Sequence, residues 1–139
     1  MAAAGTHEIT QLTELTLGFP AERQSPGRAR RLIACELRRW GHHEALVDDA
    51  VLVVSELASN AVIHAGSPFT VSIQSRDSLL RIAVRDAAPV PAGTNGDRGL
   101  LVRAPHGLAV VQALADQWGV ELADGDGIGK IVWAELRVA

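Results

Sequence analysis

Three polar side chains recur every four residues inside one of the most apolar stretches of the chain. They are Glu56, Asn60 and His64, in the segment SELASNAVIHA that spans residues 55–65. Carboxylate, amide and imidazole groups are the ones that proteins use to move protons and to bind metals and charged ligands. An unpaired carboxylate at the edge of a core is costly unless something is bound to it. If one helix carries all three residues, the spacing allows two interpretations, a binding site or a polar stripe that faces water.

The helix that would carry them is expected to run from about residue 44 to residue 65, where the sequence AGSP ends it. At about 3.6 residues per turn, each four-residue step advances about 40° around the axis. The three residues thus form a slowly winding stripe, and Asp49 lies close to the same line. The opposite arc is almost wholly apolar, which predicts burial over most of the circumference: Val47, Ala50, Val51, Val53, Val54, Leu57, Ala58 and Ala61. The alternative is a stripe that faces water, with His64 near the dipole of the last turn.

Composition limits the class of protein. The 139 residues suit one domain, 47% of them are hydrophobic and 21% charged, and the net charge is -3. These values argue against a disordered chain and against a strongly basic nucleic-acid binder, although arginines cluster between residues 23 and 39. A single cysteine, Cys35, cannot form an intramolecular disulfide, and its place in an amphipathic helix suits a buried thiol in a reducing compartment. No apolar run reaches the roughly 18 residues that span a bilayer, and the start lacks a signal peptide. A cytoplasmic protein without a membrane segment is expected.

The first half of the chain predicts a strand and a helix before the segment that carries the stripe. Residues 1–10 suggest a flexible arm, and residues 11–139 one domain. An imperfect alternation over residues 11–20 predicts a strand that Pro20 ends. Ser25 and Pro26 suit a helix start, with the serine hydroxyl as the cap, and Gly41 suits its end. The arginines lie opposite the face predicted to be buried, which consists of Ala29, Leu32, Ile33, Leu37 and Trp40.

The second half predicts two hairpins separated by a loop and a helix. FTVSIQS and LLRIAVRD form the first hairpin, with Val71, Ile73, Ile82 and Val84 on one side. Residues 87–105 form a long loop, residues 106–119 a helix, and GVELAD with KIVWAELRV a second hairpin around GDGIG. The order of elements predicts an α/β fold, a two-layer sandwich of a mixed, mostly antiparallel sheet with helices packed on one face.

These elements carry a family resemblance. SELASNAVIHA resembles the N-box of the ATPase superfamily that includes DNA gyrase, sensor histidine kinases and heat-shock chaperones, in the form found in bacterial anti-sigma-factor serine kinases. VRDAAP is similar to the family's G1 box, HGLAVVQALADQWGV to its G2 helix, and GKIVWAEL to its closing strand. The blocks follow the family's order between about residues 19 and 136. The resemblance implies the Bergerat ATP-binding fold, in which ATP lies between the helices and a lid.

The resemblance also implies a role for individual residues. Asn60 would ligate a Mg²⁺ ion that bridges the phosphates of ATP. Glu56 would accept the proton of the attacking hydroxyl. Asp86 would accept a hydrogen bond from the adenine amino group, and Gly107 would let backbone amides approach the phosphates. The remaining nucleotide-binding residues implied are His64, His106 and Leu108.

The activity that the resemblance implies is that of an anti-sigma factor that acts as a protein serine/threonine kinase. Its partners would be a sigma factor and the antagonist protein that it phosphorylates. No direct contact with nucleic acid is implied, and the relatives usually form homodimers.

Two departures from the family pattern keep a second reading open. Ala87, Ala88 and Pro89 follow Asp86 where the superfamily has glycines, and Pro105 stands in the G2 motif where a glycine is usual. Proline has no N–H to donate to a phosphate. The alternative is a degenerate nucleotide-binding fold that acts as a non-catalytic protein–protein switch. Asp86 would then only cap a turn, and Gly107 would only begin a helix.

Overall fold

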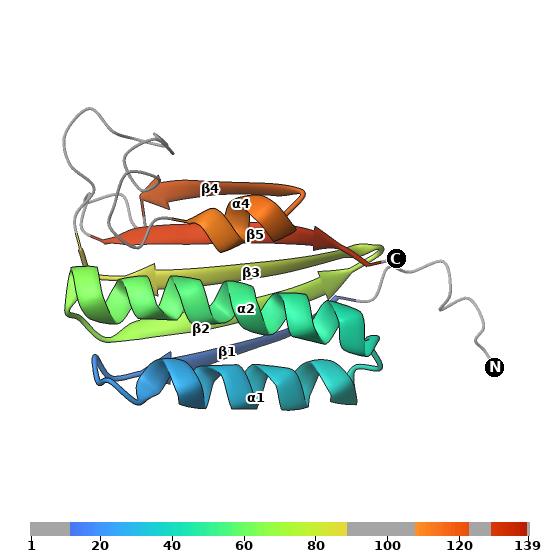
Figure 1. Cartoon of the computed structure of the whole chain (residues 1–139), viewed down its shortest axis with the longest axis horizontal. Helices are drawn as coiled ribbons and strands as arrows, with labels where there is room; N and C mark the ends of the chain where they lie inside the picture. Colours follow the sequence, from blue (N-terminus) through green and yellow to red (C-terminus); the bar gives the residue numbers. More distant parts are fainter. Residues whose placement is uncertain (1–11, 89–107, 123–128, 139) are drawn as a thin grey trace.

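Five antiparallel strands with helices on one face make up the part of the chain that the structure describes. The structure is a computed structural model, and it describes residues 12–88, 108–122 and 129–138. The sheet order is β1-β2-β3-β5-β4, and Figure 1 shows the helices in front of the sheet. The strands are β1 (Thr13–Phe19), β2 (Phe69–Arg76), β3 (Leu79–Asp86), β4 (Gln117–Leu122) and β5 (Lys130–Arg137). The helices are α1 (Ser25–Arg39), α2 (Glu44–Asn60), which continues into a π-helical turn (Ala61–Ala65), and α4 (Ala109–Leu114).

The predicted α/β sandwich is confirmed, and every pair of neighbouring strands in this sheet is antiparallel. The first hairpin has the expected register, because Val71 pairs with Val84 and Ile73 with Ile82. All four of these side chains are buried. A shift of one residue would turn them to the other face, so the alternation of apolar residues fixes the pairing.

The core lies between α2 and the sheet. Along α2, Val47, Val53 and Val54 are fully buried, and Leu57 is nearly so. Burial of each such side chain contributes roughly 1.5–3 kcal/mol relative to exposure. The apolar arc predicted for this helix is confirmed, apart from Val51, which is only half-buried. Among the described residues, no helix is both long enough and apolar enough to cross a membrane.

Helix α1 forms as predicted, but three details of the prediction are wrong. Cys35, which was expected to be buried, is exposed. Ser25 is the first helical residue rather than the cap, and the cap position is held by Gln24 without a side-chain hydrogen bond. The buried Ser25 hydroxyl instead donates to the carbonyl oxygen of Pro20 at 2.8 Å. Leu32 is 45% exposed, because it lies about 100° around the axis from Ile33, which faces the core.

Helix α4 is shorter than predicted. Residues 106–119 were expected to be helical, but α4 ends at Leu114 and β4 begins at Gln117. The segment is drawn into the sheet because the N–H of Asp116 donates to the carbonyl oxygen of Glu135 at 2.8 Å. The Asp116 carboxylate also accepts a hydrogen bond from the N–H of Arg137. The predicted arm, most of the long loop and most of GDGIG lie outside the described residues.

The face of the sheet opposite the helices is polar. The hydroxyls of Thr16 and Ser72 are 3.0 Å apart on neighbouring strands. Arg81 forms an ion pair with Glu135 and lies over the ring of Trp133, 4.5 Å from its centroid. These cross-strand pairs suit a face that meets water. The helix-covered face is therefore the one to search for a buried site.

Candidate functional site

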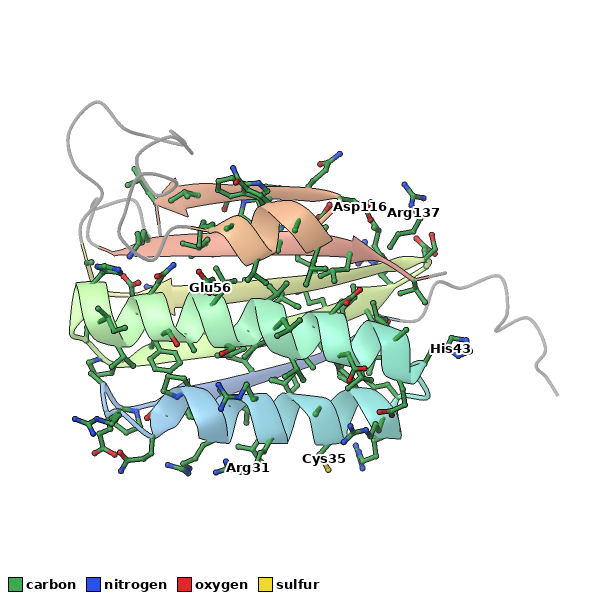
Figure 2. The ribbon with its side chains drawn as sticks, viewed as in Figure 1. Arg31, Cys35, His43, Glu56, Asp116 and Arg137 are labelled. Atoms are coloured by element: carbon green, nitrogen blue, oxygen red, sulfur yellow. The ribbon has the colours of Figure 1, made fainter. Side chains whose placement is uncertain are left out.

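Helix α2 carries Glu56 and Asn60 on its edge toward α4. Figure 2 shows Glu56 on the side of α2 that is turned to α4 and away from α1. Asn60 follows one turn later, and both residues are half-buried. Ser55 faces the other way, since its hydroxyl accepts a hydrogen bond of 2.9 Å from Arg30 of α1. Glu56 and Asn60, two of the three residues of the predicted stripe, thus lie at the edge of the core and not on the solvent side of the helix.

The side-chain oxygen of Asn60 is buried, and it has no hydrogen-bond partner among the described residues. Burial of an unsatisfied polar atom costs about 1–3 kcal/mol. Native proteins keep few such atoms, and those that persist often mark a ligand or an ion that binds there. The unpartnered oxygen is therefore the clearest sign of a binding site in the described part of the chain.

The end of α2 turns away from this stripe. A hydrogen bond of 3.0 Å joins the N–H of Gly66 to the carbonyl oxygen of Ala61, five residues back, and closes the π-helical turn. Gly66 has a φ of 62°, the left-handed conformation that favours glycine. The wider turn interrupts the four-residue spacing, so His64 is exposed while Asn60 is half-buried. His64 as a nucleotide-binding residue stays a prediction.

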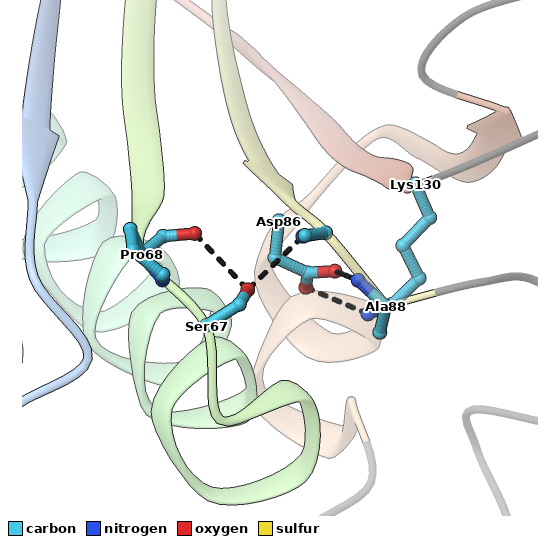
Figure 3. A network of polar contacts seen from close by, with 6 residues as sticks. Ser67, Pro68, Asp86, Ala88 and Lys130 are labelled. Carbon is cyan, nitrogen blue, oxygen red and sulfur yellow. Dashed lines mark hydrogen bonds and ion pairs between the residues drawn. The ribbon is translucent and has the colours of Figure 1, made fainter.

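Asp86 ends β3 beside the turn that follows α2. The Ser67 hydroxyl oxygen accepts a hydrogen bond of 3.0 Å from the N–H of Ala87 and donates one to the carbonyl oxygen of Pro68. One Asp86 oxygen accepts from the N–H of Ala88 at 2.9 Å. The other lies 2.6 Å from the Lys130 ammonium nitrogen. Figure 3 shows this network, which joins the turn after α2 to the ends of two strands.

Leu108, at the cap position of α4, is fully buried. Its side chain belongs to the core, so only its backbone could reach a nucleotide. His106 and Gly107, the other predicted residues of this segment, lie outside the described residues. The structure thus brings α2, the end of β3 and the start of α4 together at one end of the sheet, because α2 contacts both β3 and α4.

A groove of about 880 Å³ lies on the opposite side of α2, between the start of α1 and the end of α2. The three guanidinium groups of Arg23, Arg30 and Arg31 line it, together with Val62 and Ile63. Sequence reasoning missed this groove and treated the arginines as a solvated face. No local sequence pattern indicated the groove; the structure shows it through the apolar side chain of Ile63, which is 58% exposed at the end of the helix.

Comparison with known families agrees with this geometry. A model for the histidine kinase-like ATPase domain matches residues 19–136, which is most of the chain. The chain belongs to the histidine kinase-like ATPase family. The predicted resemblance is therefore confirmed, and with it the block order that runs from the N-box to the closing strand. A comparison with curated proteins finds no significant match.

The fold of this histidine kinase-like ATPase domain also matches a solved structure. The crystal structure of the RsbU and RsbW domains of Rv1364c from Mycobacterium tuberculosis aligns with a TM-score of 0.68 at 20% sequence identity. The alignment covers 91% of this chain and 32% of that chain, so this chain spans about a third of the other protein's length. At this identity the likeness shows the fold.

Membership of an ATPase family implies that the domain binds ATP. The segment that resembles the N-box, with Glu56 and Asn60, lies on α2, and the segment that resembles the G1 box ends β3 at Asp86. The match with the family covers these positions but tests no role for any of them.

Proposed function

We propose that this domain is an anti-sigma factor that binds Mg²⁺ and ATP and phosphorylates a serine or threonine of its antagonist protein. The observation that carries the proposal is the buried side-chain oxygen of Asn60, one turn after Glu56 on the edge of α2, which has no hydrogen-bond partner among the described residues. Membership of the ATPase family supports it, as does the fold shared with a structure that contains an RsbW domain.

The residues present fit a magnesium ion. An amide oxygen is a hard ligand, and Asn60 offers one that no described residue uses. No three His, Cys, Asp or Glu side chains converge within residues 12–88, 108–122 and 129–138. Mg²⁺ commonly takes one or two protein ligands and completes its shell with phosphate oxygens and water. When bound, the ion would neutralise charge on the phosphates, and Asn60 would hold it.

Glu56 is the residue that we assign to proton transfer. It precedes Asn60 by four residues, about one helical turn, so the two side chains share an edge of α2. From this place Glu56 can reach the same phosphate without ligating the metal. A carboxylate in this place accepts the proton of a serine or threonine hydroxyl as that oxygen attacks the terminal phosphorus. The phosphoryl group then moves to the hydroxyl oxygen, and ADP leaves.

The partners that we propose are proteins. The groove beside α1 is lined by basic residues, which include Arg23 and Arg31, and by apolar residues, which include Ile63. An acidic segment with one or two apolar side chains fits this combination, because steering by charge and burial of apolar area would act together. A sigma factor or the antagonist protein would supply that segment. Arg31→Glu should weaken this contact, whereas Arg39→Glu at the other end of α1 should not.

The kinase activity is tested with radiolabelled ATP, Mg²⁺ and candidate antagonist proteins. Wild-type protein should transfer label to a serine or threonine of one antagonist. Glu56→Gln should lower the rate at least about 100-fold while ATP still binds, since general-base catalysis typically contributes 10²–10⁴-fold. If no antagonist is labelled, or if Glu56→Gln reacts at the wild-type rate, the kinase proposal is wrong.

A second candidate function is a non-catalytic switch that binds nucleotide weakly or not at all. Pro105 in the G2 motif favours it, because that residue lacks an amide donor. Calorimetry with ATP and ADP separates the two functions. Micromolar binding that Asn60→Ala abolishes would exclude an empty site.

A further inference from the structure

Lys130 and Asp86 form a buried ion pair whose place in the fold calls for a functional explanation. They are direct partners across β3 and β5, and their side chains are only 12% and 3% exposed. Removal of two opposite charges from water costs several kcal/mol per ion, and a buried pair seldom repays more than this cost. Apolar residues at both positions would make the fold about as stable. The pair is therefore better explained by something that binds to it.

The pair retains hydrogen-bonding capacity. A carboxylate accepts about four hydrogen bonds, and the described residues give Asp86 two, from Lys130 and from the N–H of Ala88. An ammonium group has three N–H donors, and one of them is directed at Asp86. An acceptor and a charged donor thus lie side by side at the end of β3, next to the turn that follows α2 (Figure 3).

We propose that Lys130 and Asp86 together read the Watson–Crick edge of adenine. Along this edge adenine presents its N6 amino donor beside its N1 acceptor. Asp86 accepts from N6 and Lys130 donates to N1, so the base meets one partner for each polar group. The inference rests on the proposed binding of ATP and adds Lys130 as a specificity-determining residue.

The same arrangement rejects guanine docked in the same orientation. Guanine presents the O6 acceptor where adenine has its amino donor. The O6 acceptor would face the Asp86 carboxylate, and the N1–H donor would face the Lys130 ammonium group. Two buried mismatches, one of acceptor facing acceptor and one of donor facing donor, disfavour guanine more strongly than the loss of one good contact would. Wild-type protein should therefore bind GTP at least about 100-fold more weakly than ATP.

A double-mutant cycle tests the contact between Lys130 and N1. The ligands are ATP and 1-deaza-ATP, in which a C–H group replaces N1, and the proteins are wild type and Lys130→Met. Wild type should bind 1-deaza-ATP about 10- to 100-fold more weakly than ATP, as expected for loss of a charge-assisted hydrogen bond. In Lys130→Met the two ligands should differ less than about threefold. Arg137→Met removes the same charge from the far end of β5 and should retain the wild-type difference.

The outcomes separate this inference from the proposed function. If Lys130→Met binds ATP as tightly as wild type or more tightly, then Lys130 pairs with the Asp86 carboxylate without contacting the base, and the inference is overturned. It is also overturned if wild type binds 1-deaza-ATP and ATP equally, a measurement that needs no variant and stands even if Lys130→Met fails to fold. If wild type binds no nucleotide at millimolar concentration, the proposed function fails, and the inference falls with it.

Discussion

The backbone N–H of Ala87 donates a hydrogen bond of 3.0 Å to the side-chain oxygen of Ser67, twenty residues earlier in the chain. This bond joins the turn after α2 to the residue that follows Asp86. The turn after α2 is thus tied to the end of β3 by this side chain as well as by the pairing of Phe69 with Asp86. Ser67 has no charge and lies in neither motif, so any effect of its removal on ATP binding would come from a shift in the position of Asp86 relative to α2.

Ser67→Ala should weaken ATP binding several-fold and cost only about 0.5–1.5 kcal/mol of the free energy of unfolding, the value of one net hydrogen bond. Calorimetry with Mg²⁺ and ATP gives the first quantity, and urea unfolding gives the second. Ser72→Ala is the matched control, because it removes a hydroxyl that contacts Thr16 on the open face of the sheet. Equal loss of stability with unchanged ATP affinity in both variants would refute the positioning role.

A second prediction concerns the close contact between Gly119 and Trp133 on neighbouring strands. A Cβ added at Gly119 would lie 2.9 Å from Cζ2 of the indole. Because overpacking usually costs about 1–3 kcal/mol, Gly119→Ala should lower the free energy of unfolding by that amount. Gly18→Ala is the control, since a Cβ there meets nothing within 4 Å. A Gly119→Ala protein as stable as wild type would mean that the indole moves aside without cost.

Local patterns predicted the elements that position the site. The spacing of apolar residues along α2 is set by helix geometry, and the alternation in β2 and β3 is set by the pleat. Both predictions are confirmed because α2 and the sheet each bury one face against the same core. The boundary between α4 and β4 was wrong because it depends on pairing with β5, a contact between distant residues that outweighs the helical pattern of residues 106–119.

Only part of the candidate site could be predicted from local patterns. The side of α2 that carries Glu56 and Asn60 followed from spacing, and the family resemblance added Asp86. The contact between Asp86 and Lys130 joins residues 44 positions apart, so no local pattern indicated it. The π-helical turn before Gly66 also left no local signal, and it is the reason that His64 departs from the stripe.

A third prediction follows from His42, whose pKa is lowered by burial first and by the charge of the neighbouring His43 second. The unfolded chain therefore binds more protons than the folded chain in the pH range just below the ordinary pKa of 6.5. Stability should fall as the pH falls through this range. Urea unfolding at pH 7.5 and about pH 5.5 should show a smaller difference for His42→Gln than for wild type. His43→Gln should keep most of the wild-type difference, because burial is the larger cause; an unchanged difference in His42→Gln would contradict the assignment.

A fourth prediction is that Asn60 lowers the stability of the nucleotide-free protein and yet is needed for binding of Mg²⁺ and ATP. Its buried oxygen lacks a partner among the described residues, so a side chain of similar size without polar atoms removes a desolvation cost. Asn60→Leu should raise the free energy of unfolding by about 1 kcal/mol when no nucleotide is present. Saturating Mg²⁺ and ATP should then stabilise wild type but not the variant, since a ligand stabilises only the state that binds it.

Thermal and urea unfolding with and without nucleotide measure both effects. Ser59→Leu, one position earlier and on the groove side of α2, should keep the stabilisation by ATP. An Asn60→Leu protein that is less stable than wild type would mean that the oxygen is satisfied in the folded chain. One that is still stabilised by ATP would mean that Asn60 does not hold the metal.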